Sequence, residues 1–146
     1  MFIENPSRTD ALIEQLTAVW EASVKATHTF LSEEDISSLK PIVKSALLQI
    51  KVLIVAYKMN QAVGFMGIAQ EKLEMLFLEP NCIGKGIGKA FISKAKEEYS
   101  VKYVDVNEQN PHAVEFYKHA GFTVFERTER DEQGNTFPIL KMKRVE

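Results

Sequence analysis

Two stretches near the N-terminus carry apolar residues at intervals of three and four, the spacing of one face of an α-helix. The first stretch follows Thr9 or Asp10, either of which can cap a helix, and its apolar positions are Leu12, Leu16, Val19, Trp20 and Val24. The second stretch begins at Ser32, has Asp35 in the place of a capping-box acid, and continues through Ile36, Leu39, Ile42, Val43 and Leu47. Pro41 lies inside this second pattern, and because proline removes a helical hydrogen bond we expect it to bend or split the helix.

Most of the chain beyond residue 51 consists of short runs rich in β-branched and aromatic residues, which predict strands. Met59-Asn60 separates two of these runs and predicts a hairpin, while Pro138 assigns part of the last run to a sheet edge or a bulge. The last two strands flank a predicted turn at Asp131-Glu132-Gln133-Gly134-Asn135. The predicted strands are Phe2–Glu4, Val52–Lys58, Gln61–Ala69, Leu73–Leu78, Val101–Val106, Thr123–Arg130 and Thr136–Lys143.

Two further helices are predicted among these strands. One covers Ile87 to about Tyr99. The other runs from Pro111 to Ala120, with Asn110 as its N-cap and Gly121 suited to the left-handed residue after its end. The resulting order, β-αα-βββ-α-β-α-ββ, predicts a single α/β domain over residues 1–146 with mixed strand pairing and at least one crossover.

The composition is that of an ordinary globular protein, and its net charge of −2 argues against a protein that coats nucleic acid or anionic lipid. Residues Met1 to Asp10 lack the features of a signal peptide, and the longest apolar run, Val52 to Ala56, is far too short to span a bilayer. We therefore expect a cytoplasmic protein without nucleic-acid or membrane partners. Cys82 is the only cysteine and the histidines lack metal-ligand spacing, so neither a disulfide nor a metal site is expected.

A glycine-rich loop leads from a predicted strand into a predicted helix. Gly84, Gly86 and Gly88 alternate with other residues, and Lys85 and Lys89 add local positive charge. Glycines let backbone amides approach a ligand, and the start of a helix carries unpaired N–H groups, so the loop is suited to phosphate or diphosphate. No Ser or Thr follows either Gly-Lys pair, and the third glycine of a dinucleotide fingerprint would fall on Lys89. A loop without a ligand and a nucleotide site remain the alternatives.

This loop, with Pro80 before it, is followed by the motif Asn110-x-x-Ala113-x-x-Phe116-Tyr117-x-x-x-Gly121-Phe122. Together the two motifs resemble the GNAT superfamily of N-acetyltransferases, and the order of helices and strands is similar along nearly the whole chain. The run from Trp20 to Leu31 further resembles a subgroup of small bacterial GNAT proteins, some of whose members acetylate protein lysines.

The resemblance implies a mixed, mostly antiparallel sheet of about seven strands flanked by about four helices, with the central strands Leu73–Leu78 and Val101–Val106 splayed apart. It also implies that acetyl-CoA is the co-substrate. Ile83 stands where the family usually has Gln or Arg, from which we expect weaker acetyl-CoA binding, and Asn110 is first an N-cap and second a cofactor contact. The residues that the resemblance assigns to acetyl-CoA are Leu76, Phe77, Leu78, Ile83, Gly84, Lys85, Gly86, Ile87, Gly88, Lys89, Asn110 and Tyr117.

The resemblance also suggests catalytic groups. Tyr117 matches the family position that protonates the departing thiolate, and its alternative role is that of a core aromatic residue. Glu74 is the candidate general base, with Glu71, a water relay or a merely solvated Glu74 as the alternatives. Alternation would put Glu74, Leu76 and Leu78 on one side of an ideal strand, although a bulge would break that phase.

Trp20, His28 and Phe30 are the candidates for the pocket of the acceptor amine. A histidine beside aromatic residues is also typical of simple packing. Glu21 and Glu33 near the same corner would suit a cationic amine, and they fit equally well on the solvated face of two helices.

The predicted function is that of an N-acetyltransferase that transfers an acetyl group from acetyl-CoA to a primary amine by direct attack. Protein lysines and small molecules both remain open as acceptors, and both a monomer and a homodimer remain open as assemblies. The alternative is a non-catalytic acyl-CoA-binding module that signals CoA status to a partner.

Overall fold

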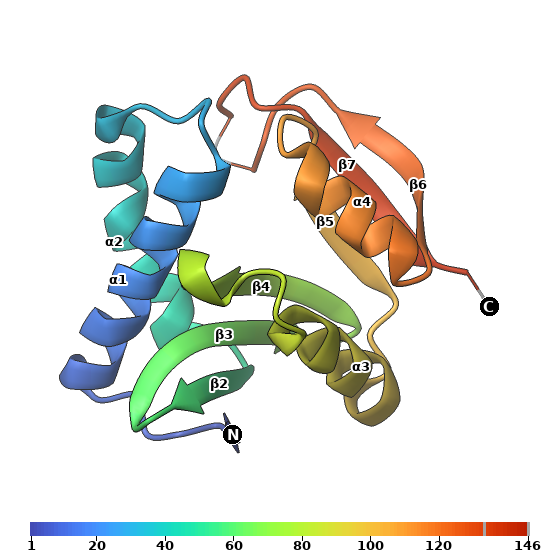
Figure 1. Ribbon diagram of the computed structural model, residues 1–146. Coiled ribbons are helices and arrows are strands. Elements are labelled where there is room, and N and C mark those ends of the chain that lie inside the picture. Colours follow the sequence, from blue (N-terminus) through green and yellow to red (C-terminus); the bar gives the residue numbers. More distant parts are fainter. Residues whose placement is uncertain (133, 146) are drawn as a thin grey trace.

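The computed structural model describes the chain except for residues 133 and 146 (Figure 1). Within this described part, helices lie on both faces of a mixed sheet, in agreement with the flanking helices that the resemblance implies. Gln133, in the middle of the turn expected at 131–135, lies outside the described residues. None of the described helices is long and apolar enough to cross a membrane.

Helices α1 (Asp10–Thr27) and α2 (Glu33–Gln49) begin where the capping residues predict. The Thr9 side chain accepts a hydrogen bond from the Leu12 amide, and Ser32 and Asp35 form a reciprocal capping box. Of the bend or split expected at Pro41, the split does not occur, because α2 continues through this residue. Pro41 and Ser37, whose carbonyl loses its helical partner, are both exposed, and water can therefore replace the missing hydrogen bond.

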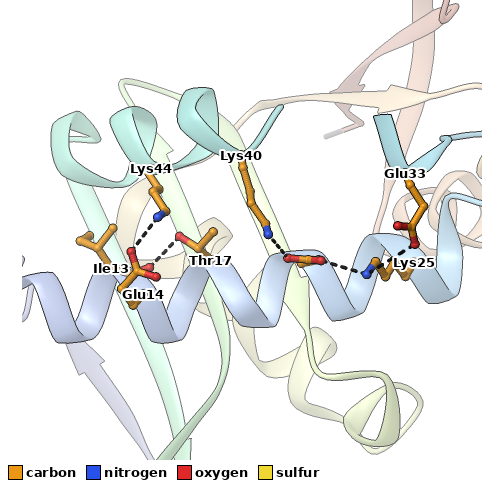
Figure 2. Close-up of polar contacts among 8 residues, drawn as sticks. Ile13, Glu14, Thr17, Lys25, Glu33, Lys40 and Lys44 are labelled. Atoms are coloured by element: carbon orange, nitrogen blue, oxygen red, sulfur yellow. Dashed lines mark hydrogen bonds and ion pairs between the residues drawn. The ribbon is translucent and has the colours of Figure 1, made fainter. Parts of the chain in front are cut away.

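Ion pairs join α1 to α2 along their exposed faces (Figure 2). Lys40 of α2 lies 2.6 Å from Glu21 of α1, and Lys44 lies 2.6 Å from Glu14. Glu21 also pairs with Lys25 at 2.9 Å, one turn along the same helix. Hydrogen bonds from Lys40 and Lys25 lower the pKa of the Glu21 carboxyl. Lysines of the chain itself therefore compensate the charge of Glu21, which leaves it less suited to bind a cationic acceptor.

In the part of the chain that the structure describes, the sheet contains seven strands in the order β1-β2-β3-β4-β5-β7-β6, and only β4 and β5 are parallel. Met59 and Asn60, both with positive φ, form the β2–β3 turn, as expected of a tight hairpin. β7 begins just after Pro138, which leaves that residue outside the strand. The strands are β1 (Phe2–Glu4), β2 (Val52–Lys58), β3 (Gln61–Ala69), β4 (Lys72–Leu78), β5 (Tyr103–Asn107), β6 (Phe122–Thr128) and β7 (Ile139–Arg144).

The two central strands separate soon after they meet. β4 and β5 pair only at Lys72↔Tyr103 and Leu73↔Val104, and the rest of β4 pairs with β3 alone. Figure 1 shows β4 and β5 diverging from this point. The predicted splay of the sheet is therefore present, and it leaves one edge of β4 without a strand partner.

Two apolar clusters fill the spaces between the sheet and the helices. One lies under α3 (Ile87–Tyr99) and α4 (Pro111–His119), and the other lies under α1 and α2. β4 contributes to both clusters, because Leu76 and Leu78 face α3 and α4 whereas Met75 and Phe77 face the N-terminal helices. The open edge of β4 is thus held between two packed layers.

Candidate active site

The glycine loop between β4 and α3 has an open backbone. After the short 3₁₀ turn Pro80–Cys82, Gly84 and Gly86 take φ values of 80° and 90°, which glycine adopts without strain. A Cβ at either position would meet nothing within 4 Å, so space for a ligand lies beside the main chain. Ile83, in the place usually taken by Gln or Arg, is 46% exposed.

The loop presents a row of unpaired amides. The first backbone hydrogen bond of α3 runs from the Ala90 N–H to the Gly86 carbonyl. The N–H groups of residues 84–89 make no hydrogen bond within the described part of the chain. These donors lie at the positive end of the helix dipole, and the side chains of Lys85 and Lys89 are exposed beside them. The arrangement can hold a diphosphate.

Gly88 brings the start of α3 close to α4 and β4. A Cβ on Gly88 would lie 3.4 Å from the Phe116 ring of α4 and 3.7 Å from a methyl group of Leu78 on β4. The glycine at this position therefore allows close packing, whereas Gly84 and Gly86 supply positive φ. The packing places the anion site next to the helix that carries Tyr117.

Tyr117 is a core residue with an accessible hydroxyl. Its side chain is 8% exposed and its ring packs edge-on against Phe116 and Phe122. The Tyr117 hydroxyl makes no hydrogen bond to a described residue. Every fully buried side-chain oxygen in the described part of the chain has a hydrogen-bond partner, so the Tyr117 oxygen is not fully buried. Solvent therefore reaches the Tyr117 oxygen. Burial raises the pKa of this hydroxyl, which keeps it protonated near neutral pH.

Asn110 is the N-cap of α4, as the sequence predicts. Its side-chain oxygen accepts a hydrogen bond from the Ala113 amide at 3.3 Å, and the residue is buried. The structure thus gives Asn110 a local role that fixes the start of the helix carrying Tyr117.

Glu74 lies at a β-bulge, which changes its direction. Gly67 of β3 pairs with Met75 and Ile68 pairs with Leu73, so Glu74 is the extra residue on β4. Leu73 consequently joins Leu76 in the cluster under α3 and α4, and simple alternation does not place Glu74 with them. The alternation of an ideal strand therefore does not hold at Glu74, because the bulge that the sequence allows for is present.

A charged cluster that the sequence does not reveal surrounds Glu74. Lys72 Nζ lies 2.8 Å from Asp105 on β5, 3.8 Å from Glu74 and 3.9 Å from Glu132 of the β6–β7 connection. Burial raises the pKa of Glu74, Lys72 lowers it, and the carboxylates of Glu132 and Asp105 raise it, with a net increase. Glu74 is therefore a stronger base than an ordinary carboxylate. The only sequence signal for this cluster is the spacing of Lys72 and Glu74, since Asp105 arrives through strand pairing.

Glu71, the alternative base, is engaged elsewhere. Its carbonyl accepts hydrogen bonds from the amides of Lys102 and Tyr103, and its carboxylate lies 3.4 Å from Lys102 Nζ. Glu71 lies at the turn before β4, next to the residues at which β4 and β5 are still paired. This position favours Glu74 over Glu71.

The three candidate acceptor residues occupy two places. Trp20 is 4% exposed and lies in the apolar cluster under α1 and α2. His28 and Phe30 lie between α1 and α2, with ring centroids 5.4 Å apart, and Phe30 lies 5.4 Å from Phe137 in the β6–β7 connection. The structure thus brings His28 and Phe30 together with Phe137, which the sequence does not single out. No group of acidic, histidine or cysteine side chains suited to a metal occurs among the described residues.

Comparisons with known proteins agree with this geometry. A family model described as an acetyltransferase (GNAT) domain matches residues 21–145. The peptidyl-lysine N-acetyltransferase YjaB of Escherichia coli is 37% identical over 132 residues, which are 90% of each chain. The solution structure of apo-form YjaB covers 99% of this chain and 98% of its own, with a TM-score of 0.87.

A more distant structure shares the fold. The PaiA N-acetyltransferase of Thermoplasma acidophilum, solved in complex with coenzyme A, is 23% identical, with a TM-score of 0.70 over 98% of this chain and 99% of its own. The comparisons do not support a non-catalytic acyl-CoA-binding module. The chain belongs to the GNAT family and is an N-acetyltransferase that uses acetyl-CoA.

Proposed function

We propose that this enzyme acetylates the ε-amino groups of protein lysines, with Glu74 as general base and Tyr117 as general acid. The observation that carries the proposal is the similarity, over nine-tenths of both chains, to a relative named as a peptidyl-lysine N-acetyltransferase. The raised pKa of Glu74 and the accessible hydroxyl of Tyr117 supply the two proton-transfer groups that the chemistry requires.

The glycine loop and β4 would hold acetyl-CoA. The amides of residues 84–89 fit its diphosphate, with Lys85 and Lys89 adding charge. The unpaired edge of β4 near Leu76–Leu78 offers backbone groups to the pantetheine arm, and an amide there can polarise the thioester oxygen. When bound, acetyl-CoA supplies an activated acetyl group.

The two side chains then move the protons. Glu74 removes a proton from the acceptor ammonium, and the neutral amine forms the new C–N bond as the C–S bond breaks. Tyr117 donates its proton to the departing thiolate. The nitrogen loses its second proton as the amide forms, and this proton returns to Tyr117 by way of solvent. The products are an acetylated lysine, free coenzyme A and a proton released from Glu74.

A comparison of acceptors tests the lysine assignment. We expect coenzyme A release with a peptide that has a blocked α-amine and one lysine, and none with the same peptide carrying arginine instead. Mass spectrometry of the product should place the acetyl group on the lysine. Turnover of small amines with no turnover of any lysine peptide or protein would contradict the acceptor, while leaving the acetyltransferase activity in place.

Tyr117→Phe tests the acid. Because the ring is kept, the core should remain folded, while loss of the proton donor should lower kcat by about a hundredfold. Tyr57→Phe is the matched control, since Tyr57 packs under the N-terminal helices, and it should retain full kcat. Unchanged turnover of Tyr117→Phe at saturating substrates would show that Tyr117 is not the acid.

A further inference from the structure

His28 lies where two connections of the chain meet. It caps the C-terminus of α1, its ring lies against Phe30, and Phe30 in turn contacts Phe137 of the β6–β7 connection. Figure 1 shows the α1–α2 connection beside the red β6–β7 segment at the top of the molecule. Glu132, in the same β6–β7 connection, reaches Lys72 next to Glu74. One segment of chain therefore links the surroundings of His28 to those of the proposed base.

The hydrogen bonds of Thr27 fix the tautomer of His28. Thr27 Oγ1 lies 2.8 Å from the Ser23 carbonyl and 2.8 Å from His28 Nδ1. The hydroxyl has one proton, and the carbonyl can only accept, so Thr27 donates to Ser23. Both contacts are hydrogen bonds only when His28 Nδ1 carries the proton and donates to Thr27. The other ring nitrogen, Nε2, is then unprotonated.

This Nε2 is both free and accessible. His28 makes no other side-chain hydrogen bond to a described residue. Every fully buried side-chain nitrogen in the described part of the chain has a hydrogen-bond partner, so Nε2 is not fully buried. Solvent therefore reaches Nε2. Burial lowers the pKa of His28 to about 4, so near neutral pH the ring presents a lone pair and no charge. A nitrogen with such a pKa accepts hydrogen bonds but takes protons poorly from an ammonium group.

We infer that His28 is a specificity-determining residue of the acceptor site, whose unprotonated Nε2 accepts a hydrogen bond from an N–H group of the lysine acceptor. The inference rests on the proposed function, since it concerns the same acceptor. Phe30, whose ring lies against His28, and Phe137 on the other side of Phe30 are both partly exposed, and they supply apolar surface for the methylene groups of a lysine side chain. His28 therefore orients the acceptor, while Glu74 removes the proton.

His28→Phe removes the acceptor nitrogen and keeps an aromatic ring against Phe30. We expect the KM for a lysine peptide to rise about three- to tenfold, as for loss of one hydrogen bond, while kcat and the KM for acetyl-CoA stay within about twofold. His28→Gln, which restores a side-chain acceptor, should recover part of the loss. Unchanged peptide KM in His28→Phe, with lysine acetylation intact, would overturn the inference but not the proposed function.

A paired measurement separates the peptide amide from the ε-ammonium group as the donor. A rise in KM for the peptide alone would assign the bond to a backbone amide, whereas an equal rise for a simple alkylamine would assign it to the ammonium. Both results support His28 as the acceptor of the bond.

Thr27 offers a test that does not depend on activity. In ¹⁵N-histidine NMR spectra of the wild-type protein, His28 should show a protonated Nδ1 and a bare Nε2 that stays neutral down to about pH 4. Thr27→Ser should preserve this tautomer, whereas Thr27→Val should lose it and raise the peptide KM. A wild-type spectrum with Nε2 protonated would overturn the inference even if a variant failed to fold.

Discussion

The proton affinity of Glu74 depends on charges from three separate segments. Lys72 lies two residues away on β4, Asp105 arrives from β5, and Glu132 arrives from the β6–β7 connection. Lys72 lies closer to Asp105 than to Glu74, so it lowers the pKa of Glu74 only in part. Partial burial therefore dominates, and the pKa of the carboxyl rises. At the scale of single residues, the pKa of the proposed base depends on side chains from three segments of the chain.

Lys72→Met should move the pH profile of the reaction. Glu74 acts as a base only when it is ionised, so kcat/KM should fall as the pH drops through its raised pKa. Lys72 stabilises the ionised form, and its removal should raise this pKa further and shift the acidic limb to higher pH. The check is kcat/KM for one peptide between pH 5 and 9.

Lys102→Met is the matched control. Lys102 pairs with Glu71, so its removal should leave the acidic limb of the pH profile where it is. Glu74→Gln should lower kcat/KM by about a hundredfold or more and flatten the limb. An acidic limb that moves to lower pH in Lys72→Met would contradict the conclusion that Lys72 lowers the pKa of Glu74.

The connection between β4 and α3 acts as one element, because the amides of residues 84–89 have no hydrogen-bond partner among the described residues. Gly86 is the residue before α3, and its φ of 90° directs the chain into the helix. The open space around its missing Cβ means that conformation, and not crowding, requires glycine there. The loop can therefore be disturbed without touching the core.

Gly86→Ala should strain the loop by about 1–2 kcal/mol and displace its amides. We expect a lower melting temperature and a several-fold higher KM for acetyl-CoA. Gly121→Ala is the control, because Gly121 has φ 99° and equally open surroundings but lies at the end of α4. It should lose comparable stability with an unchanged KM for acetyl-CoA. An equal rise in KM for both variants would mean that the glycine loop has no special role.

Elements with local signals were predictable from the sequence, and contacts between distant elements were not. The capping box at Ser32 and the turn at Met59-Asn60 lie where their side chains and backbone require them. The bulge at Glu74 was not predictable, because it depends on how β3 and β4 register. The same holds for Asp105, which reaches Lys72 only through the parallel pairing of β4 and β5.

The candidate site divides in the same way. The glycine loop and the α4 motif can be recognised in the sequence, because each needs a particular residue type at a particular position. The tautomer of His28 depends on Thr27 next to it, yet it becomes readable only once the hydroxyl is seen to reach Ser23. Phe137 was not found, because no local pattern links it to Phe30.

At the scale of the whole molecule, the sheet consists of two parts joined by a short seam. β1 to β4 form one part and β5 to β7 the other, and two residue pairs connect them. Phe30 in the α1–α2 connection also contacts Phe137 in the β6–β7 connection, which joins the two parts a second time. Figure 1 shows these two connections side by side at the top of the molecule. A ligand that fills the gap along β4 would add further contacts across the seam, so binding and global stability should be coupled.

Coenzyme A should therefore stabilise the protein and protect β4 in particular. At a ligand concentration of 100 times Kd, linkage adds about 2.7 kcal/mol, which raises the melting temperature of a domain of this size by about 5–10 °C. Hydrogen exchange should slow at the amides of Leu76–Leu78 and residues 84–89, and change little in β2. ATP and NAD serve as controls, since they offer a diphosphate but no pantetheine for the open edge. Equal stabilisation by ATP would mean that the loop alone binds the ligand and that the splayed strands contribute nothing.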